Sequence, residues 1–119
     1  MGETGSGSVI GKSMVPVLTI DEFCKKNSIN YIDILKIDAQ GFDFQVIKGA
    51  ADMLQSGKIG QLYFEIIFSE MYKNVPRFSE IYDFLKDRGF LLVSLYEFHY
   101  QNGLAGWTDG LFIHQSAYK

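Results

Sequence analysis

The sequence predicts an α/β fold in which helices cover a mixed β-sheet. Short apolar runs alternate with helical segments of roughly 10–15 residues, in the order strand, helix, strand, helix, strand, which is typical of parallel strands joined by helices. The last two predicted strands have only a turn between them. They should therefore form an antiparallel pair, so the sheet is expected to be mixed.

The chain opens with a Gly/Ser-rich segment, residues 1–14, which we predict to be a flexible lead-in to a single domain over residues 15–119. Residues 15–20 alternate enough to predict a strand. Thr19 and Glu22 then have the spacing of a capping box, in which each side chain accepts from the other residue's backbone amide. This motif predicts a short helix over residues 21–26.

Residues 32–38 form an isoleucine-rich apolar run, which is the pattern of a buried strand. Apolar residues then recur with helical spacing, which predicts a helix over residues 42–55. Gly49 should break or bend this helix, and Gly57 should end it.

Polar residues stand where this strand ends: Lys36, Asp38 and Gln40. In an open α/β sheet the carboxyl ends of the strands line the crevice where ligands bind, so these residues are candidates for chemistry. The alternative is a solvated strand end whose carboxylate only caps the following helix.

Residues 61–68 form the second apolar strand, interrupted only by Glu65. A carboxylate in an otherwise buried run is costly unless it is paired or exposed at the strand end. Two interpretations stay open for Glu65, a paired core acid and a pocket acid.

The remainder of the chain predicts one helix and two strands. An amphipathic helix is expected over residues 77–88. A strand should follow over residues 91–95, extending toward residue 98. After a turn-rich stretch at residues 101–106, the last strand should cover residues 110–114.

Composition excludes several classes of function. The 119 residues carry a net charge of −3, which offers no basic field for nucleic acid or an anionic membrane. No apolar run approaches the roughly 20 residues that span a bilayer. The single cysteine, Cys24, cannot form an internal disulfide, so we expect a reduced, cytoplasmic setting. His99 and His114 are isolated in the sequence, so no zinc-type metal site is expected.

The segment from Leu35 to Ala50, Leu-Lys-Ile-Asp-Ala-Gln-Gly-Phe-Asp-Phe-Gln-Val-Ile-Lys-Gly-Ala, resembles the signature of the FkbM-type methyltransferases. The resemblance extends along the chain to four further segments: Val15–Phe23, Tyr63–Glu65, Ile81–Phe90 and Trp107–Ile113.

The resemblance implies a Rossmann-like class I methyltransferase sheet and an S-adenosylmethionine-dependent enzyme. The expected reaction is O-methyl transfer to a hydroxyl of a small-molecule or sugar-like acceptor. Family members hold the cofactor with a glycine-rich loop and an acidic residue that precede this region, and this sequence has neither. The chain is therefore expected to correspond to the C-terminal part of the domain, to lack the N-terminal half and to be inactive alone, with its cofactor-binding residues unknown.

The resemblance and the strand-end argument together suggest roles for particular residues. Asp38 is the first candidate for a general base or for orienting the acceptor, with Lys36 tuning its charge. Glu65 could hold the acceptor or the amino group of the cofactor. Weaker candidates for the rim of the site are Gln40, Tyr72 and Asp109.

The family's sheet order also predicts partners. In that order the strand at residues 32–38 pairs on one side with a strand that this chain does not contain, which leaves an unpaired apolar edge. We expect this edge to drive homo-oligomerisation or pairing with a separate N-terminal half. An alternative function is a non-catalytic assembly module that binds a partner through the same edge.

Overall fold

The computed structural model describes residues 9–10, 13–14, 18–69 and 74–118. Its elements, in chain order, are β1 (Val9–Ile10), β2 (Ser13–Met14), α1 (Ile20–Lys26), β3 (Ile32–Lys36), α2 (Asp43–Lys48), α3 (Ala51–Gln55), β4 (Ile59–Ile67), α4 (Phe78–Lys86), β5 (Phe90–Gln101), β6 (Leu104–His114) and the 3₁₀-helix η1 (Gln115–Ala117).

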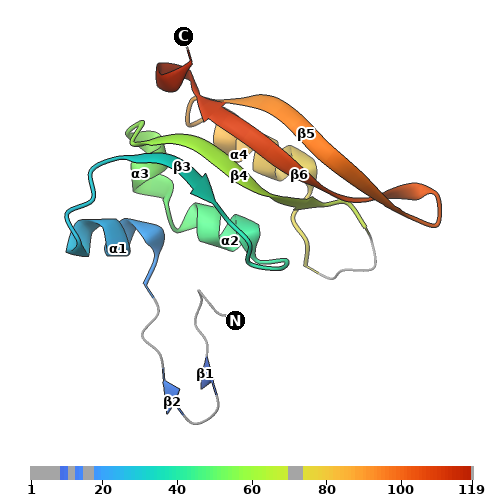
Figure 1. Cartoon of the computed structure of the whole chain (residues 1–119), viewed down its shortest axis with the longest axis horizontal. Helices are drawn as coiled ribbons and strands as arrows, with labels where there is room; N and C mark the ends of the chain where they lie inside the picture. Colours follow the sequence, from blue (N-terminus) through green and yellow to red (C-terminus); the bar gives the residue numbers. More distant parts are fainter. Residues whose placement is uncertain (1–8, 11–12, 15–17, 70–73, 119) are drawn as a thin grey trace.

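The main sheet has four strands in the order β3-β4-β6-β5 (Figure 1). The strands β3 and β4 are parallel, whereas β6 is antiparallel to both β4 and β5. The sheet is therefore mixed and its last two strands form an antiparallel hairpin, as the sequence predicted. Because β6 inserts between β4 and β5, a residue late in the chain lies beside each residue of β4 from Gln61 to Ile67.

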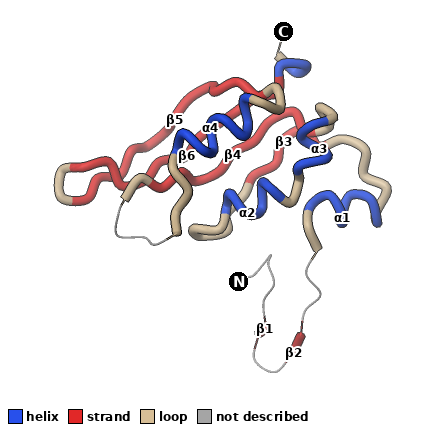
Figure 2. The backbone as a smooth tube through the Cα atoms, turned by 180° about the vertical axis from the view of Figure 1, so that it is seen from behind, coloured by secondary structure: helices blue, strands red, loops and turns tan. Residues whose placement is uncertain are grey.

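The core lies between the sheet and the helices α2, α3 and α4, which lie on one face of it (Figure 2). Side chains along β4 alternate: Leu62, Phe64 and Ile66 are buried against the helices, while the residues between them are half-buried. This alternation follows from the two-residue period of a strand. Phe64 also stacks on Phe112 of β6, with ring centres 5.6 Å apart.

The opposite face of the sheet, which we call the open face, is only partly shielded in the described part of the chain. It carries the half-buried side chains Tyr63, Glu65 and Ile67 of β4 and Trp107, Asp109, Leu111 and Ile113 of β6. On β3, Ile34 is 52% exposed. Parallel strands in proteins are generally covered on both faces, so this exposure is unusual for the β3–β4 pair.

The predicted capping box at the start of α1 is present. The Thr19 hydroxyl accepts from the Glu22 amide at 3.1 Å, and the Glu22 carboxylate accepts from the Thr19 amide at 2.9 Å. Asp21, which directly precedes Glu22, accepts from the amides of Asp52 and Met53 at 2.8 and 3.0 Å. The first turn of α1 therefore contains its own capping box, and through Asp21 it also caps the backbone amides at the start of α3.

The helix predicted over residues 42–55 is divided at Gly49, as expected. Its two parts are α2 and α3, and Gly49 is the C-cap of α2. The Gly49 carbonyl accepts from the amide of Asp21 at 3.0 Å, and a Cβ at position 49 would lie 3.2 Å from Cβ of Thr19. The close approach of α1 therefore requires a small residue at the break.

The strand predicted over residues 15–20 was wrong where the structure describes it. It is not formed at residues 18–20, because Thr19 serves as the N-cap and Ile20 already begins α1; residues 15–17 lie outside the described part. Two short strands, β1 and β2, pair within residues 9–14, and the division into a lead-in over residues 1–14 and a domain over residues 15–119 stays a prediction.

The hairpin is longer than predicted, since β5 and β6 continue to Gln101 and Leu104 on either side of a two-residue turn. Asn102 and Gly103 both have positive φ, at 52° and 79°. An Asn-Gly pair favours this tight reversal. Most of the stretch predicted as a turn therefore belongs to the strands.

Candidate active site

A cavity of about 450 Å³ lies at the carboxyl ends of β3 and β4. Its wall consists of Asp38, Gln40, Gly41, Glu65, Ile67 and Trp107. Three of the residues predicted from the sequence, Asp38, Gln40 and Glu65, thus meet at the edge of the sheet where ligands of α/β folds bind. We call this space the strand-end cavity.

A sharp reversal after β3 forms one side of the strand-end cavity. Gln40 and Gly41 both adopt positive φ, at 47° and 99°. The Phe42 amide then donates to the Ala39 carbonyl at 3.2 Å, which closes the turn before α2 begins. Asp38 is exposed at the start of this reversal, immediately after the buried Ile37.

A buried carboxylate, Asp43, joins the ends of the two strands. It is 3% exposed, and its two oxygens accept from the backbone amides of Ala39 at 2.8 Å and Glu65 at 2.9 Å. Burial raises its pKa most, and the two amide hydrogen bonds act in the opposite direction. Asp43 therefore holds the backbone of Ala39, the neighbour of Asp38, in a defined position relative to the backbone of Glu65.

Asp43 was not among the site residues predicted from the sequence. The available signal was an acidic residue in the first turn of a helix that follows a strand-end turn, and such a residue usually only stabilises its own helix. Here α2 has no side-chain cap at its N-terminus, Phe42 being the N-cap, and Asp43 accepts from the strands instead. Its role depends on the pairing of β3 with β4, which is not local in the sequence.

Glu65 stands in the wall of the strand-end cavity. Its carboxylate accepts no hydrogen bond from any described residue, and the structure therefore gives it the position of a pocket acid. Burial is the main cause that raises its pKa, followed by the negative charges of Asp43, Asp109 and Asp38, while His99 lowers it. Glu65 consequently holds a proton more readily than a solvated glutamate.

Of the remaining predicted residues, Lys36 and Asp109 lie on the open face beside the cavity. The Lys36 ammonium is 5.4 Å from the ring centre of Tyr63. In the described part of the chain Lys36 does not form an ion pair with Asp38. Asp109 accepts from the Tyr63 hydroxyl at 3.1 Å and does not line the cavity. This hydrogen bond is the first cause that raises the pKa of Tyr63. Tyr72 lies outside the described residues.

An aromatic wall of the cavity was also missed as a site feature. Trp107 lies beside Ile67 in the register between β6 and β4, and His99 stands opposite Trp107 in β5. The imidazole and indole rings stack, with centres 5.2 Å apart and planes inclined by 14°. Only the strand register brings these three residues together, so no local pattern in the sequence indicated this wall.

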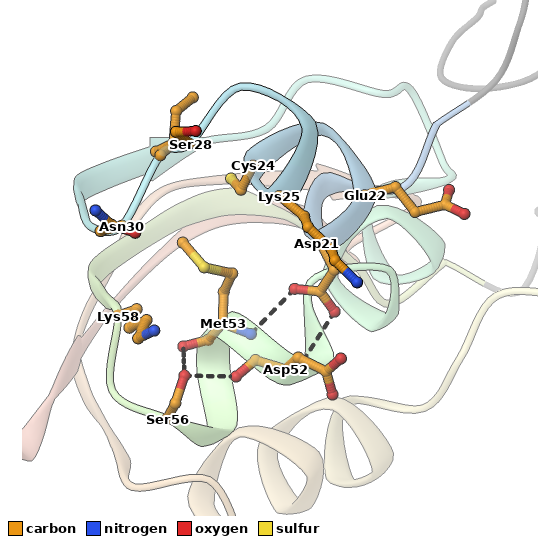
Figure 3. Close-up of a pocket in the computed structure, with 11 residues that line it drawn as sticks. Asp21, Glu22, Cys24, Lys25, Ser28, Asn30, Asp52, Met53, Ser56 and Lys58 are labelled. Carbon is orange, nitrogen blue, oxygen red and sulfur yellow. Dashed lines mark hydrogen bonds between the residues drawn. The ribbon is translucent and has the colours of Figure 1, made fainter.

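A larger cavity of about 740 Å³ lies between α1, α3 and the segments that lead into β3 and β4 (Figure 3). The Asp21 carboxylate lines this cavity, but both of its oxygens already accept hydrogen bonds from backbone amides of α3. Cys24 is buried, and burial, followed by the charge of Asp21, raises the pKa of its thiol. Because this cavity lies at the amino ends of the parallel strands, the strand-end cavity is the better candidate site.

The described residues show neither a group of three metal-ligating side chains nor a helix long and apolar enough to cross a membrane. The side chains that line the strand-end cavity are two carboxylates, a carboxamide, an isoleucine and an indole.

A scan against protein-family models matches the chain to the Methyltransferase FkbM domain over residues 3–92. No curated protein and no solved structure matches in the corresponding searches. The matched range contains Asp38, Gln40, Asp43 and Glu65, and it ends before Trp107. The match covers more than half of the chain and supports methyl transfer as its general function. The chain belongs to the FkbM methyltransferase family.

Proposed function

We propose that this chain forms the acceptor side of an S-adenosylmethionine-dependent methyltransferase that methylates a hydroxyl of a small-molecule or sugar-like acceptor. The observation that carries the proposal is the meeting of Asp38, Gln40 and Glu65 in one cavity, at the carboxyl ends of two parallel strands. The family assignment supports the same class of reaction and does not favour a non-catalytic assembly module.

Asp38 is the proposed general base. A hydroxyl is a poor nucleophile at neutral pH, and positioned proton transfer contributes about 10²–10⁴ in rate. The Asp38 carboxylate is exposed to the cavity and has no hydrogen-bond partner among the described residues. It does not cap α2, which has no side-chain cap. Asp38 is therefore free to accept a proton from a bound hydroxyl.

Glu65 and Gln40 are the proposed binding groups. The Glu65 carboxylate is held in the cavity wall because its own amide donates to Asp43. Gln40 adds a carboxamide, which can both donate and accept. Lys36, Asp109 and Tyr72 stay candidates for the rim; Asp109 already accepts from Tyr63 and would act on the ligand only through that pair.

The cavity fits only part of the cofactor. S-adenosylmethionine, when bound, supplies an electrophilic methyl group, and it carries an ammonium group, a ribose diol and a carboxylate. The carboxylates of the cavity suit the first two, but no lysine or arginine lines it in the described part of the chain. The residues that hold the cofactor are therefore proposed to lie outside this cavity, in an N-terminal half or a partner subunit.

The sheet supports the same proposal. Among the described strands, β3 pairs only with β4, which leaves its other edge unpaired. On its open face Ile34 is half exposed, although parallel strands usually have helices on both faces. An N-terminal half or a second copy of the chain could supply a further strand to pair with the free edge of β3 and helices to cover Ile34 on the open face.

Substitution of Asp38 by Asn in the complete protein tests the catalytic role. We expect release of S-adenosylhomocysteine in the presence of hydroxylated acceptors to fall by about 10²–10⁴, with little change in the affinity for that product. Asp83→Asn on the exposed side of α4 is the matched control. Unchanged turnover in folded Asp38→Asn protein would remove Asp38 from the mechanism.

A further inference from the structure

The strand-end cavity has one flat apolar wall. The indole of Trp107 and the side chain of Ile67 lie side by side across the β4–β6 pair, and both line the cavity. The His99 ring is stacked on the indole and restricts its orientation. A rigid aromatic plane of this kind presents a large contact area to a flat ligand at low entropic cost.

The remaining lining is rich in hydrogen-bond acceptors. Asp38 and Glu65 offer carboxylates, and Gln40 offers a carboxamide. Ionised carboxylates only accept, so the ligand has to supply donors. A purely apolar ligand would leave these groups desolvated without partners, which lowers affinity strongly.

The charges at the cavity oppose an anionic ligand. Glu65 lies within the electrostatic influence of three further carboxylates, Asp38, Asp43 and Asp109. Among the described residues no lysine or arginine lines the cavity to offset them. A ligand that carries a carboxylate or phosphate would therefore be repelled.

The carboxamide of Gln40 separates a hydroxylated ligand from a simple cation. A hydroxyl donates and accepts, so it can pair with a carboxylate and with the Gln40 amide at once. An ammonium group only donates, and it would leave the amide nitrogen of Gln40 without a partner. A ring that carries several hydroxyls matches both the polar groups and the flat wall.

We propose that the acceptor is an uncharged sugar ring, which packs its apolar face on Trp107 and donates its hydroxyls to Glu65 and Asp38. This inference rests on the proposed methyl transfer and narrows its acceptor class. Trp107 and Gln40 then determine specificity, and Asp38 receives the proton of the hydroxyl that is methylated.

Trp107 is the sole tryptophan of this 119-residue chain, and the part of a fluorescence change that Trp107→Phe abolishes reports directly on this wall. The complete protein is titrated with methyl glucoside, with glucuronate and with glucosamine, which differ mainly in charge. We expect a saturable fluorescence change with methyl glucoside and an affinity for glucuronate at least about tenfold lower. Equal or tighter binding of glucuronate, tighter binding of glucosamine, or no response to methyl glucoside would each overturn the proposal.

The variant Glu65→Gln sharpens the test because it removes one charge and keeps the shape. We expect the preference for methyl glucoside over glucuronate to shrink severalfold, whereas Glu80→Gln on α4, which is exposed and distant in the sequence, should retain it. An unchanged preference in folded Glu65→Gln protein would contradict the charge argument.

Binding of S-adenosylhomocysteine, measured on the same samples, separates the two proposals. If that ligand binds and a non-sugar alcohol is methylated while sugars give no response, the acceptor class is wrong and methyl transfer stands. If sugars bind but S-adenosylhomocysteine does not, the proposed enzyme is wrong and the sugar site stands.

Discussion

Replacement of Asp43 by Asn should loosen the two strand ends that form the candidate site. In the native chain both oxygens of Asp43 accept backbone amides, from Ala39 at 2.8 Å and from Glu65 at 2.9 Å. An asparagine has one oxygen, so it can accept only one of the two amides. Its NH₂ group would face the other amide, and two donors would then oppose each other in a buried position.

The size of the effect follows from these two bonds. A hydrogen bond to a charged group contributes about 1.5–3 kcal/mol, and a buried donor left without a partner costs about 1–3 kcal/mol. The variant also removes a carboxylate that burial disfavours, which offsets part of the loss. We expect Asp43→Asn to lower the free energy of unfolding by about 2 kcal/mol, a large share of the roughly 5–15 kcal/mol of an ordinary domain.

Urea unfolding at neutral pH, followed by the fluorescence of Trp107, measures this change. Asp83→Asn is the matched control, since Asp83 is exposed on α4, and its effect should stay within about 0.5 kcal/mol. If Asp43→Asn and the control have the same stability, the Asp43 carboxylate does not hold the strand ends together and the reasoning is refuted.

Three further predictions use the same unfolding assay. Asp21→Ala removes the side chain that caps α3 and should cost about 1–2 kcal/mol; a loss below about 0.3 kcal/mol would refute this cap. Gly106→Ala places a Cβ 2.9 Å from the backbone oxygen of His99, so β5 and β6 must separate at a cost of about 1–3 kcal/mol, and an unchanged stability would show that the strands can adjust freely. The free energy of unfolding should fall as the pH rises from about 4 toward neutrality. Burial raises the pKa of Asp43 and of Glu65, so the folded chain binds more protons than the unfolded chain in this range. Glu65→Gln should make this fall less steep, and an unaltered pH dependence would contradict the raised pKa of Glu65.

Local signals in the sequence predicted much of the fold. The spacing of Thr19 and Glu22 predicted the start of α1, and Gly49 predicted the division between α2 and α3. Both features are decided by a few neighbouring residues. The short connection between the last two strands likewise predicted their antiparallel pairing. The full length of that hairpin escaped prediction because Gly103 and Gly106 made residues 101–106 resemble a turn, although only Asn102 and Gly103 reverse the chain.

The candidate site was predictable only in part. The rule for the carboxyl edge of α/β sheets selected Asp38, Gln40 and Glu65 from the sequence, and all three line one cavity. Asp43 and Trp107 could not be identified in the same way. Their positions depend on the register of β4 with β3 and with β6, which joins residues far apart in the chain.

Calorimetric titration with S-adenosylhomocysteine, with the mass of each species measured by light scattering, tests whether this fold takes part in methyl transfer. We expect that the 119-residue chain alone, as a monomer, does not bind this product, since its cavity fits only part of the cofactor. We expect saturable binding once a second copy or an N-terminal half completes the sheet beside β3. A folded, completed assembly that gives no binding heat and no competition with S-adenosylmethionine would contradict the assignment of a methyltransferase.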